Sequence, residues 1–495
     1  MGVVLAGVPD QLRVPLAYIE FDNTRALSGA GSIAYKVLLI GQRQTVGQVA
    51  AGVLQRILSP DHAEQAFGMG SMLAAMFKGF KTANRMMETW AIALNDDAEG
   101  TAATGLLSLA VAEGLSAGTL NLYIAGIRVR VGVTASNTAA ELATKLITAI
   151  NANPRLPVAA SVVAGQSHQV RLTANHKGEV GNDLDVRLNY YPEDTTPVGL
   201  TVTITGMSSG AGNPDMTSAL AALGDEWWNA LVVPYTDSAN RAVLQTELES
   251  RWGPLSMKDA RAWMAFKGTH GETADFGAAL NSQHFTIMGT GASPTPPYVW
   301  AAVNAAVANA SLAIDPARPL QTLELPGVLP PASGDRWDFS SRNLLLYDGI
   351  STYKVTADNR VLIERQITTY QTNALGADDE SYLDVETPST LSFLRYSWRQ
   401  RIELRFPRHK LRADPPSGVS LPLGQPMVTP SVIREETLSL FREWEDRGLV
   451  EDFDQFAEEL IVEIDQSNPN RINCLIGPNL VNQFRIFAGQ IQFIL

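Results

Sequence analysis

The chain has very little cysteine. Cys474 is the only one among 495 residues, so no disulfide can form within the chain. A chain without disulfides is consistent with folding in a reducing compartment. Cys474 lies between Asn473 and Leu475 in a strand-like run, and no histidine is near it in the sequence. We therefore expect a buried structural thiol at this position and not a nucleophile.

Targeting signals and long apolar runs are also lacking. The N-terminus does not have the basic and then apolar pattern of a signal peptide, and no uninterrupted apolar run reaches the roughly 18 residues of a membrane span. We therefore expect no direct membrane binding. The chain would leave a cell only as part of a larger particle.

Positive charge is scarce relative to negative charge. The sequence has 38 Lys and Arg against 51 Asp and Glu, which gives a formal net charge of −13. Phosphate backbones are bound through Lys and Arg, so this balance disfavours direct nucleic-acid binding. It permits a basic protein partner.

Signatures of catalysis or cofactor binding are few. Gly68-Met-Gly70 and Gly289-Thr-Gly291 are fragments of glycine-rich loops, and neither completes a dinucleotide fingerprint or a P-loop. No two histidines are spaced three to five residues apart, which excludes helical metal pairs of the HExxH kind. The histidines are His62, His168, His176, His270, His284 and His409. We expect no catalytic residues, no cofactor, no metal and no enzymatic activity.

The pattern of apolar residues predicts an α/β core that is interrupted by an insertion. Strand-like and helix-like stretches alternate in residues 26–100 and again in residues 208–386, which predicts one doubly wound domain built from two segments. Residues 101–207 contain alternating strands around tight glycine turns and one helix, Thr138–Ile150. They predict an inserted β-rich module, and the Gly- and Ser-rich run 206–214 would be its exit linker.

Within the core, some boundaries follow from local signals. Tyr35–Gly41 is a buried-strand run, and Ser59 and Pro60 have the residue types of a helix N-cap and a first helical residue. An Ala-rich helix is expected from about Pro297 to Ala310. A further helix is expected from Ser218 to about Glu226.

Residues 387–485 predict an α+β C-terminal domain. Thr429 and Pro430 again have the residue types of an N-cap and a first helical residue, and Gly448 would end that helix. A second helical stretch and the strand Ile461–Ile464 follow.

Residues 1–25 and 486–495 predict extended terminal arms. The run Val14–Phe21 is strand-like without an adjacent hairpin partner, which suits either an edge strand or an arm that pairs with another subunit. Residues 490–495 alternate polar and apolar side chains as far as Ile494. A free terminal strand this apolar should be covered, or it would aggregate. The side chains expected at subunit interfaces are Val14, Leu16, Tyr18, Ile19, Phe21, Ile491, Phe493 and Leu495.

An acidic run lies between Arg434 and Asp465, where twelve acidic and three basic residues give 3 − 12 = −9. A solvated helix face and a docking surface for a basic partner would both explain this run. The docking candidates are Glu435, Glu436, Glu443, Glu451, Asp452 and Glu458.

An ordered set of motifs near the C-terminus resembles the tail sheath proteins of Mu-like contractile-tailed phages. The motifs are Val428-Thr-Pro430, Gly448-Leu-Val-Glu451, Pro469-Asn-Arg-Ile-Asn473, Pro478-Asn-Leu-Val-Asn-Gln483 and Gln490-Ile-Gln-Phe-Ile-Leu495. The runs Arg13–Asp22 and His176–Asp183 are similar to the same family. The resemblance extends over nearly the whole chain.

The resemblance implies a structural subunit of a contractile tail sheath. Such subunits polymerise helically, as stacked hexameric rings, around an inner tail tube, and contraction drives the tube through the bacterial envelope for genome delivery. In this family the terminal arms add strands to sheets of neighbouring subunits. The implied partners are other copies of the chain, the inner tail tube protein, and baseplate and tail terminator proteins. The C-terminal domain would face the tube, and the protein would be assembled in the host bacterial cytoplasm and reside in the virion tail.

Other interpretations stay open on the sequence alone. The same architecture would serve in a phage-derived particle of the pyocin kind. A hydrolase on the α/β core would need a Ser–His or paired-carboxylate geometry in a pocket. A soluble glycan-binding module would rest on residues 101–207, whereas a sheath would carry that module as an outward-facing decoration.

Overall fold

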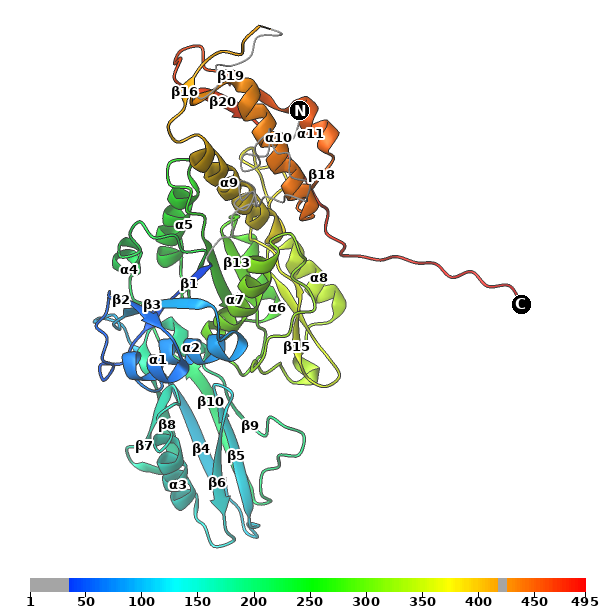
Figure 1. Cartoon of the computed structure of the whole chain (residues 1–495). Coiled ribbons are helices and arrows are strands. Elements are labelled where there is room, and N and C mark those ends of the chain that lie inside the picture. Colours follow the sequence, from blue (N-terminus) through cyan, green and yellow to red (C-terminus); the bar gives the residue numbers. More distant parts are fainter. Residues whose placement is uncertain (1–34, 417–424) are drawn as a thin grey trace, which may run out of the picture. The chain divides into compact units, whose positions relative to one another are not determined.

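The structure is a computed structural model that describes residues 35–416 and 425–495. Contacts divide the chain into two compact units: the larger holds residues 35–392 and 483–495, and the smaller holds residues 393–482 except 417–424 (Figure 1). The predicted N-terminal arm, with Val14, Leu16, Tyr18, Ile19 and Phe21, lies outside the described residues.

The larger unit is built on a six-stranded sheet in the order β13-β12-β11-β1-β3-β2. β1 pairs in parallel with β3 on one side and with β11 on the other, and the parallel pairing continues through β12 to β13. β2 is antiparallel to β3 at one edge. The strands are β1 Lys36–Gln42, β2 Leu54–Ile57, β3 Glu88–Leu94, β11 Ala230–Val232, β12 Arg261–Phe266 and β13 Phe285–Gly289. The predicted doubly wound core from two separated segments is confirmed.

Helices accompany this sheet, and a small antiparallel hairpin, β14–β15, extends the fold beyond β13. Ser59 caps α1 by accepting a hydrogen bond from the His62 amide, as the sequence predicts. α4 is shorter than predicted because Gly224, at φ +55°, ends the helical path early. The elements are α1 Pro60–Phe67, α2 Met72–Ala83, α4 Thr217–Ala221, α5 Ser238–Trp252, α6 His270–Ala278, α7 Pro297–Ile314, α8 Phe339–Tyr347, β14 Thr352–Val355 and β15 Val361–Arg365.

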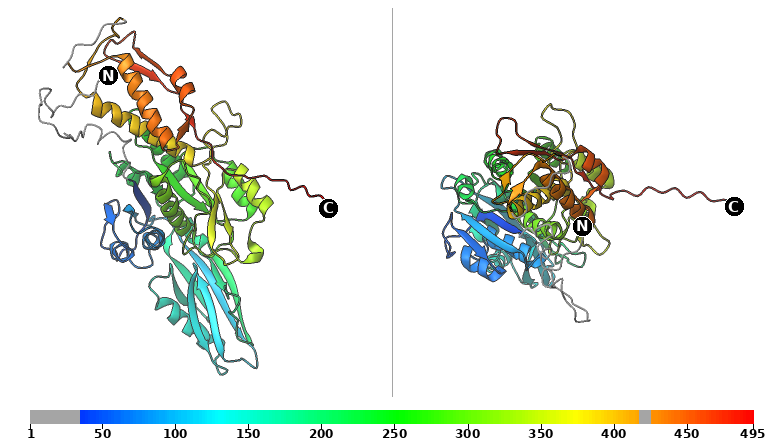
Figure 2. Two further views of the ribbon diagram at one scale, coloured as in Figure 1. Left: turned by 45° about the vertical axis from the view of Figure 1, so that its right-hand side comes forward. Right: turned by 45° about the horizontal axis from the view of Figure 1, so that its top comes forward.

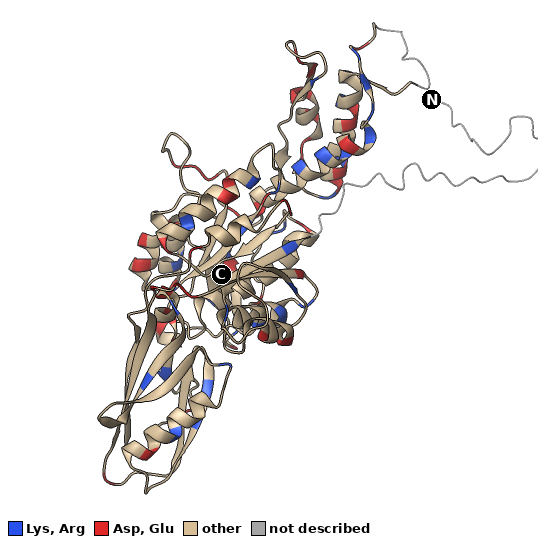
Figure 3. Cartoon of the chain, turned by 90° about the vertical axis from the view of Figure 1, so that its left-hand side faces the viewer, with Lys and Arg blue, Asp and Glu red and all other residues tan. Residues whose placement is uncertain are grey.

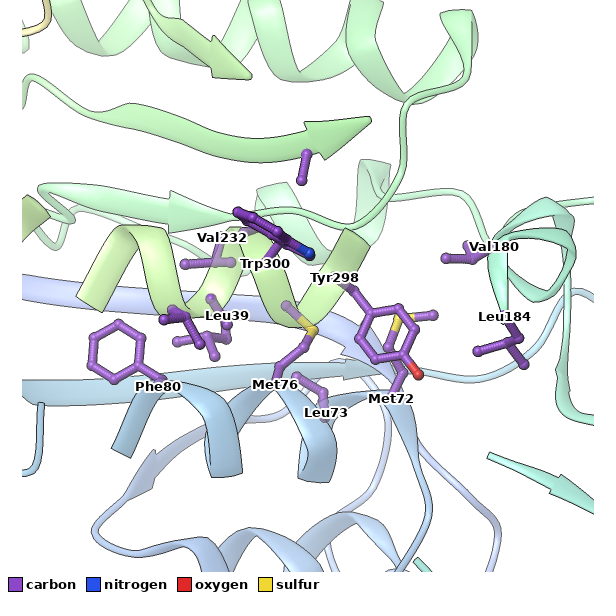
Figure 4. Packing of buried hydrophobic residues seen from close by; sticks show 14 of the residues in the cluster. Leu39, Met72, Leu73, Met76, Phe80, Val180, Leu184, Val232, Tyr298 and Trp300 are labelled. Atoms are coloured by element: carbon purple, nitrogen blue, oxygen red, sulfur yellow. The ribbon is translucent and has the colours of Figure 1, made fainter. Parts of the chain in front are cut away.

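The core of the larger unit lies between the sheet and helices α2 and α7. Figure 4 shows Phe80 and Met76 of α2 beside Leu39 of β1, with Trp300 of α7 close by. All four side chains are fully buried, and each such burial contributes roughly 1.5–3 kcal/mol. A Cβ on Gly79 would approach Val299 and Val303 of α7 to 3.0 Å, so glycine lets the two helices pack closely.

Helix α7 is long and apolar enough by length and composition to cross a membrane. The expectation that no such segment exists was therefore too strict. In the structure 67% of this helix is buried, and a core helix of a folded domain can have the same length and apolar composition.

Residues 101–208 form the inserted module. One antiparallel sheet has the order β10-β4-β8-β7, and a second has the order β6-β5-β9. The predicted helix is present as α3, and Thr138 and Glu141 form a capping box at its start. The elements are β4 Ala102–Val111, β5 Gly118–Ile124, β6 Ile127–Val133, α3 Ala139–Asn151, β7 Val158–Val163, β8 Gln166–Lys177, a short 3-10 helix Glu179–Asp183, β9 Val186–Leu188 and β10 Leu200–Ser208.

The smaller unit packs helices against short strand pairs. Thr429 caps α10 and Pro430 is its first residue, which confirms the predicted start. Phe441 and Phe456 stack at 4.0 Å between ring centroids, and the Trp444 indole donates to the Ser397 hydroxyl at 2.9 Å. The elements are α9 Glu386–Arg405, β16 Lys410–Leu411, β17 Met427–Val428, α10 Pro430–Asp446, β18 Val450–Glu451, α11 Phe453–Glu459, β19 Ile461–Ile464, β20 Ile472–Leu475 and β21 Asn479–Leu480.

Candidate assembly surfaces

The C-terminal arm, residues 486–495, is an extended segment that forms no helix or strand (Figures 1 and 2). Its apolar side chains are open to solvent: Ile491 is 92% exposed, Phe493 is 78% exposed and Leu495 is fully exposed. Contiguous exposed apolar side chains of this size mark an interaction site or an aggregation hazard. The three predicted C-terminal interface residues therefore lie where a partner can reach them.

The base of this arm is held in place within the larger unit. The Arg485 guanidinium lies 3.0 Å from the Asp384 carboxylate and 3.0 Å from Glu386, and its side chain is largely buried. The Gln321 side chain donates to the Phe484 carbonyl at 3.3 Å. Burial raises the pKa of Glu386, and the charge of Arg485 opposes that rise. A fixed base followed by an uncovered, extended apolar segment is suited to presenting the arm to another molecule.

The hairpin β19–β20 in the smaller unit has open edges. Among the described residues its two strands pair only with each other, and Ile461 lies directly opposite Leu475. These two side chains are 52% and 64% exposed. A two-stranded hairpin is marginally stable alone and presents unpaired N–H and C=O groups to a further strand. The sequence predicts β19, but it does not indicate that the hairpin could bind another strand.

Two of the six acidic docking candidates are engaged inside the smaller unit. Arg401 of α9 lies 2.8 Å from Glu436 and 2.6 Å from Glu443, and Arg405 lies 3.0 Å from Glu436. Burial acts to lower the pKa of Arg401, but its hydrogen bonds to Glu443 and Glu436 outweigh this effect and raise it. These carboxylates hold α9 to α10.

The other four acidic candidates are exposed. They are Glu435, Glu451, Asp452 and Glu458. Asp452 also caps α11 by accepting from the Gln455 amide at 3.3 Å. Figure 3 colours the acidic positions of the chain red and the basic positions blue, and both occur on the helices of the smaller unit. The structure therefore offers these four carboxylates, and not all six, to an outside partner.

The crevice where doubly wound sheets usually bind ligands is filled by the chain itself. That crevice lies at the carboxyl ends of the strands, where the strand order reverses, here between β1 and β11. At the end of β1, Gln42 donates to the Lys177 carbonyl at 2.7 Å and to the Asp96 carboxylate at 2.8 Å. Beyond β11, Asn213 donates to Asp237 at 2.9 Å. Lys177 belongs to the inserted module and Asn213 follows it, so the module covers this edge.

The partly buried His176 and the fully buried His284 have structural partners. His176 accepts from the Met72 amide through Nε2 at 3.1 Å, which leaves Nδ1 to donate to Asp96 at 3.0 Å. Since one ring nitrogen accepts, the ring is the neutral tautomer in this arrangement. Burial, aided by the charge of Arg261, lowers the pKa of His284 to about 4. Neither histidine is placed as a general base for an external substrate.

A serine in a G-x-S-x-G pattern does occur in the Gly- and Ser-rich run. Ser208 lies in Gly206-Met-Ser-Ser-Gly210, at the end of β10, an antiparallel strand that pairs with β4. The hydrolase nucleophile elbow needs a turn from a strand into a helix, so this match lacks the required context.

A cavity between α2, α7 and the β5–β6 turn has a volume of about 320 Å³, and no serine or histidine lines it. In the part of the chain that the structure describes, no group of three His, Cys, Asp or Glu residues could hold a metal. Cys474 is partly buried in β20 and not fully buried as expected, and this burial raises its pKa, which disfavours a thiolate.

Comparison with known proteins gives matches over both units. Residues 209–369 match the family described as phage tail sheath protein central domain, and residues 377–494 match the phage tail sheath C-terminal domain. The chain is 47% identical over 495 residues to the Mu-like prophage FluMu tail sheath protein of Haemophilus influenzae, with 100% of both chains covered.

Two solved structures are also similar. A chain of the anti-feeding prophage baseplate in its contracted state is 11% identical with a TM-score of 0.50, and the match covers 100% of each chain. At this identity the likeness shows a shared fold. The sheath tail protein Lin1278 of Listeria innocua is 12% identical with a TM-score of 0.48, and the match covers 92% of this chain and 94% of that one.

Proposed function

Because this chain belongs to the tail sheath protein family of Mu-like phages, we propose that it polymerises helically around an inner tail tube and contracts to drive that tube through the bacterial envelope. The observation that carries the proposal is the uncovered apolar arm, with Ile491, Phe493 and Leu495 exposed and its base held by Arg485. The arm of one copy completes a sheet in another copy. The pairing is heterologous, and such contacts build rings or helical polymers and do not close after two copies.

The energetics favour this use of the arm. A six-residue strand gains roughly 1 kcal/mol net for each hydrogen bond. Burial of each of the three apolar side chains adds roughly 1.5–3 kcal/mol. The open hairpin β19–β20 is the acceptor that suits strand addition best, since its exposed Ile461 and Leu475 would also be covered.

The free energy that drives contraction is the difference between the extended and the contracted assembly. We propose that subunits assemble in an extended, kinetically trapped arrangement and then contract without nucleotide hydrolysis, so that a barrier governs the lifetime of the extended tube. The covered switch-point edge supports this proposal, because Gln42 and Lys177 occupy the place where such sheets take nucleotides.

The domains take different places in this assembly. Residues 387–485 face the inner tail tube protein, and residues 101–207 face outward as a decoration. Copies form stacked hexameric rings in the host bacterial cytoplasm and end up in the virion tail, with baseplate and tail terminator proteins at the two ends. The same architecture in a phage-derived particle is the second candidate, and neighbouring genes would separate the two.

Electron microscopy of the purified full-length chain tests the proposal. We expect tubes or stacked rings that lengthen when inner tube is supplied, because each arm recruits another copy. A chain that stays monomeric at every concentration, with and without inner tube, would contradict the proposed function.

The exposed acidic residues of the smaller unit are expected to contribute to binding of the tube. Changing Glu435, Glu451 and Glu458 to glutamine and Asp452 to asparagine, which still caps α11, should weaken retention of the tube and flatten its dependence on salt, because salt screens attraction between exposed charges. Co-sedimentation of tube with sheath over a salt series measures both effects.

The matched control removes as many charges from the larger unit, at Glu99, Glu113, Glu193 and Glu380, which are also exposed. This variant should retain the tube as the unchanged chain does. If salt does not change how much tube any of the three proteins retains, attraction between charges does not contribute to binding of the tube.

A further inference from the structure

One exposed face of α8 carries large apolar side chains. Phe339 is 75% exposed, Leu344 is 54% exposed and Tyr347 is 72% exposed, whereas Leu345 on the opposite face is fully buried. We call these three exposed residues the α8 patch. α8 packs against α6 and β14, beyond the β13 edge of the six-stranded sheet. An isolated exposed apolar side chain is ordinary, but three on one helix face mark a surface that binds something.

A second apolar surface lies at the other edge of the same sheet. Val53 and Leu58 flank the edge strand β2 and are 47% and 66% exposed, and Met86, just before β3, is 94% exposed. We call these three residues the β2 patch. Among the described residues β2 pairs only with β3, so the outer edge of this strand is open as well.

The two patches are on opposite sides of the larger unit. The α8 patch lies beyond β13 and the β2 patch lies at β2, and the five spacings from β13 to β2 make a separation of about 24 Å at the usual strand spacing. Figure 1 shows β2 on the left side and α8 on the right side of the larger unit. One neighbour can therefore occupy each patch at the same time, which a repeating head-to-tail contact requires.

The charges beside the two patches are of opposite sign. Asp335 and Asp338 are exposed next to the α8 patch, whereas Arg342 on the same helix is paired with Glu364 at 2.7 Å. Arg85 is exposed beside Met86, and the half-exposed Arg56 of β2 is only loosely paired, with Glu88 at 3.8 Å. Opposite charges around apolar centres favour one partner and one register. A second copy of this chain supplies both the apolar and the charged complement.

We propose that the α8 patch of one copy docks against the β2 patch of the next copy, so that larger units join side by side in a repeating heterologous contact. This inference rests on the proposed function, and it adds a contact between folded units to the exchange of arms. Since both patches lie on the folded larger unit and not on an arm, this contact sets the lateral spacing of subunits.

Cysteine cross-linking in the full chain tests the inference. In a Cys474→Ser background, Met86→Cys is combined with Tyr347→Cys, and a second variant combines Val53→Cys with Phe339→Cys. A short bismaleimide is added to assembled tubes. We expect a ladder of covalent oligomers from dimer upward in at least one double variant, and no covalent dimer in any single-cysteine variant.

The control pairs Tyr347→Cys with Leu255→Cys, because Leu255 is 98% exposed and lies outside both patches. This variant should give no ladder. Dimers from Tyr347→Cys alone would show that the α8 patch pairs with itself and would overturn the inference. Tubes that form in the microscope without a ladder in either double variant would also overturn it and would leave the proposed function standing. The absence of both tubes and ladder would contradict both.

Discussion

Replacing Ile491, Phe493 and Leu495 together by alanine is expected to abolish tube formation and leave each subunit folded. The three side chains are almost fully exposed within the chain, so removing them takes no contact away from the subunit fold. In an assembled tube each would be buried, and their loss removes up to about 4–9 kcal/mol per contact. Because every 1.4 kcal/mol is tenfold in an association constant, assembly should fall by about three orders of magnitude or more.

The matched control changes the polar side chains of the same strand, Gln490 and Gln492, to alanine. This variant keeps the apolar face and the main-chain hydrogen-bonding groups, so it should still form tubes. Sedimentation and electron microscopy measure assembly, and thermal unfolding checks that all three proteins share one melting temperature. Normal tubes from the triple variant would show that the arm does not hold copies together.

Replacing Arg401 by alanine is expected to destabilise the smaller unit by about 3 kcal/mol, because it leaves Glu443 without its cation and Glu436 with Arg405 alone. Arg401 is 7% exposed and contacts both Glu436 and Glu443 at less than 3 Å. Urea unfolding is followed by tryptophan fluorescence in a chain whose seven tryptophans outside this unit are replaced by phenylalanine, so that Trp398 and Trp444 alone report it. The midpoint should fall, and the slope with urea should be unchanged if the folded state is otherwise intact.

Arg399 provides the comparison for Arg401 on the same helix. Its guanidinium is 3.6 Å from Glu403 one turn later, and both side chains are partly exposed. A surface pair of this kind contributes about 0–1 kcal/mol, so Arg399→Ala should shift the unfolding midpoint much less. Equal effects of the two substitutions would show that the ion pairs of Arg401 do not hold α9 to α10.

Local signals explain which elements the sequence predicts correctly. Ser59, Thr138 and Thr429 each have a short side-chain oxygen that can accept a hydrogen bond from an amide two or three residues later. Ser59 and Thr429 cap the helices that they were expected to cap, and Thr138 caps the helix that was expected to begin at it. The strand run at β1 is apolar because both faces of a central parallel strand are buried. These features depend on neighbours in the sequence and not on distant partners.

Helix α9 could not be predicted in the same way. Its buried residues include Thr390, Ser397 and Arg401, so the inward face is partly polar and shows no apolar stripe. Its polar groups are satisfied by residues far away in the sequence, such as Trp444, whose indole donates to Ser397. Periodicity alone cannot reveal a helix of this kind.

The same limit applies to the acidic docking candidates. In the sequence Glu436 and Glu443 have the pattern of free surface charges, because their partner, Arg401, is 35 and 42 residues away on the helix that periodicity misses. The C-terminal arm, by contrast, is predictable, since alternating apolar residues at the end of a chain have no local partner. The anchoring of its base could not be predicted from the sequence, because Arg485 contacts Asp384 and Glu386 only in the folded unit.

The most direct measurement is a cryo-electron microscopy map of assembled tubes at a resolution that traces the main chain. The account predicts that residues 490–495 leave the subunit that carries them and hydrogen-bond as a strand to a neighbouring copy, with Ile491 and Phe493 covered. A map in which this segment folds back onto its own subunit, with no strand shared between copies, would contradict it.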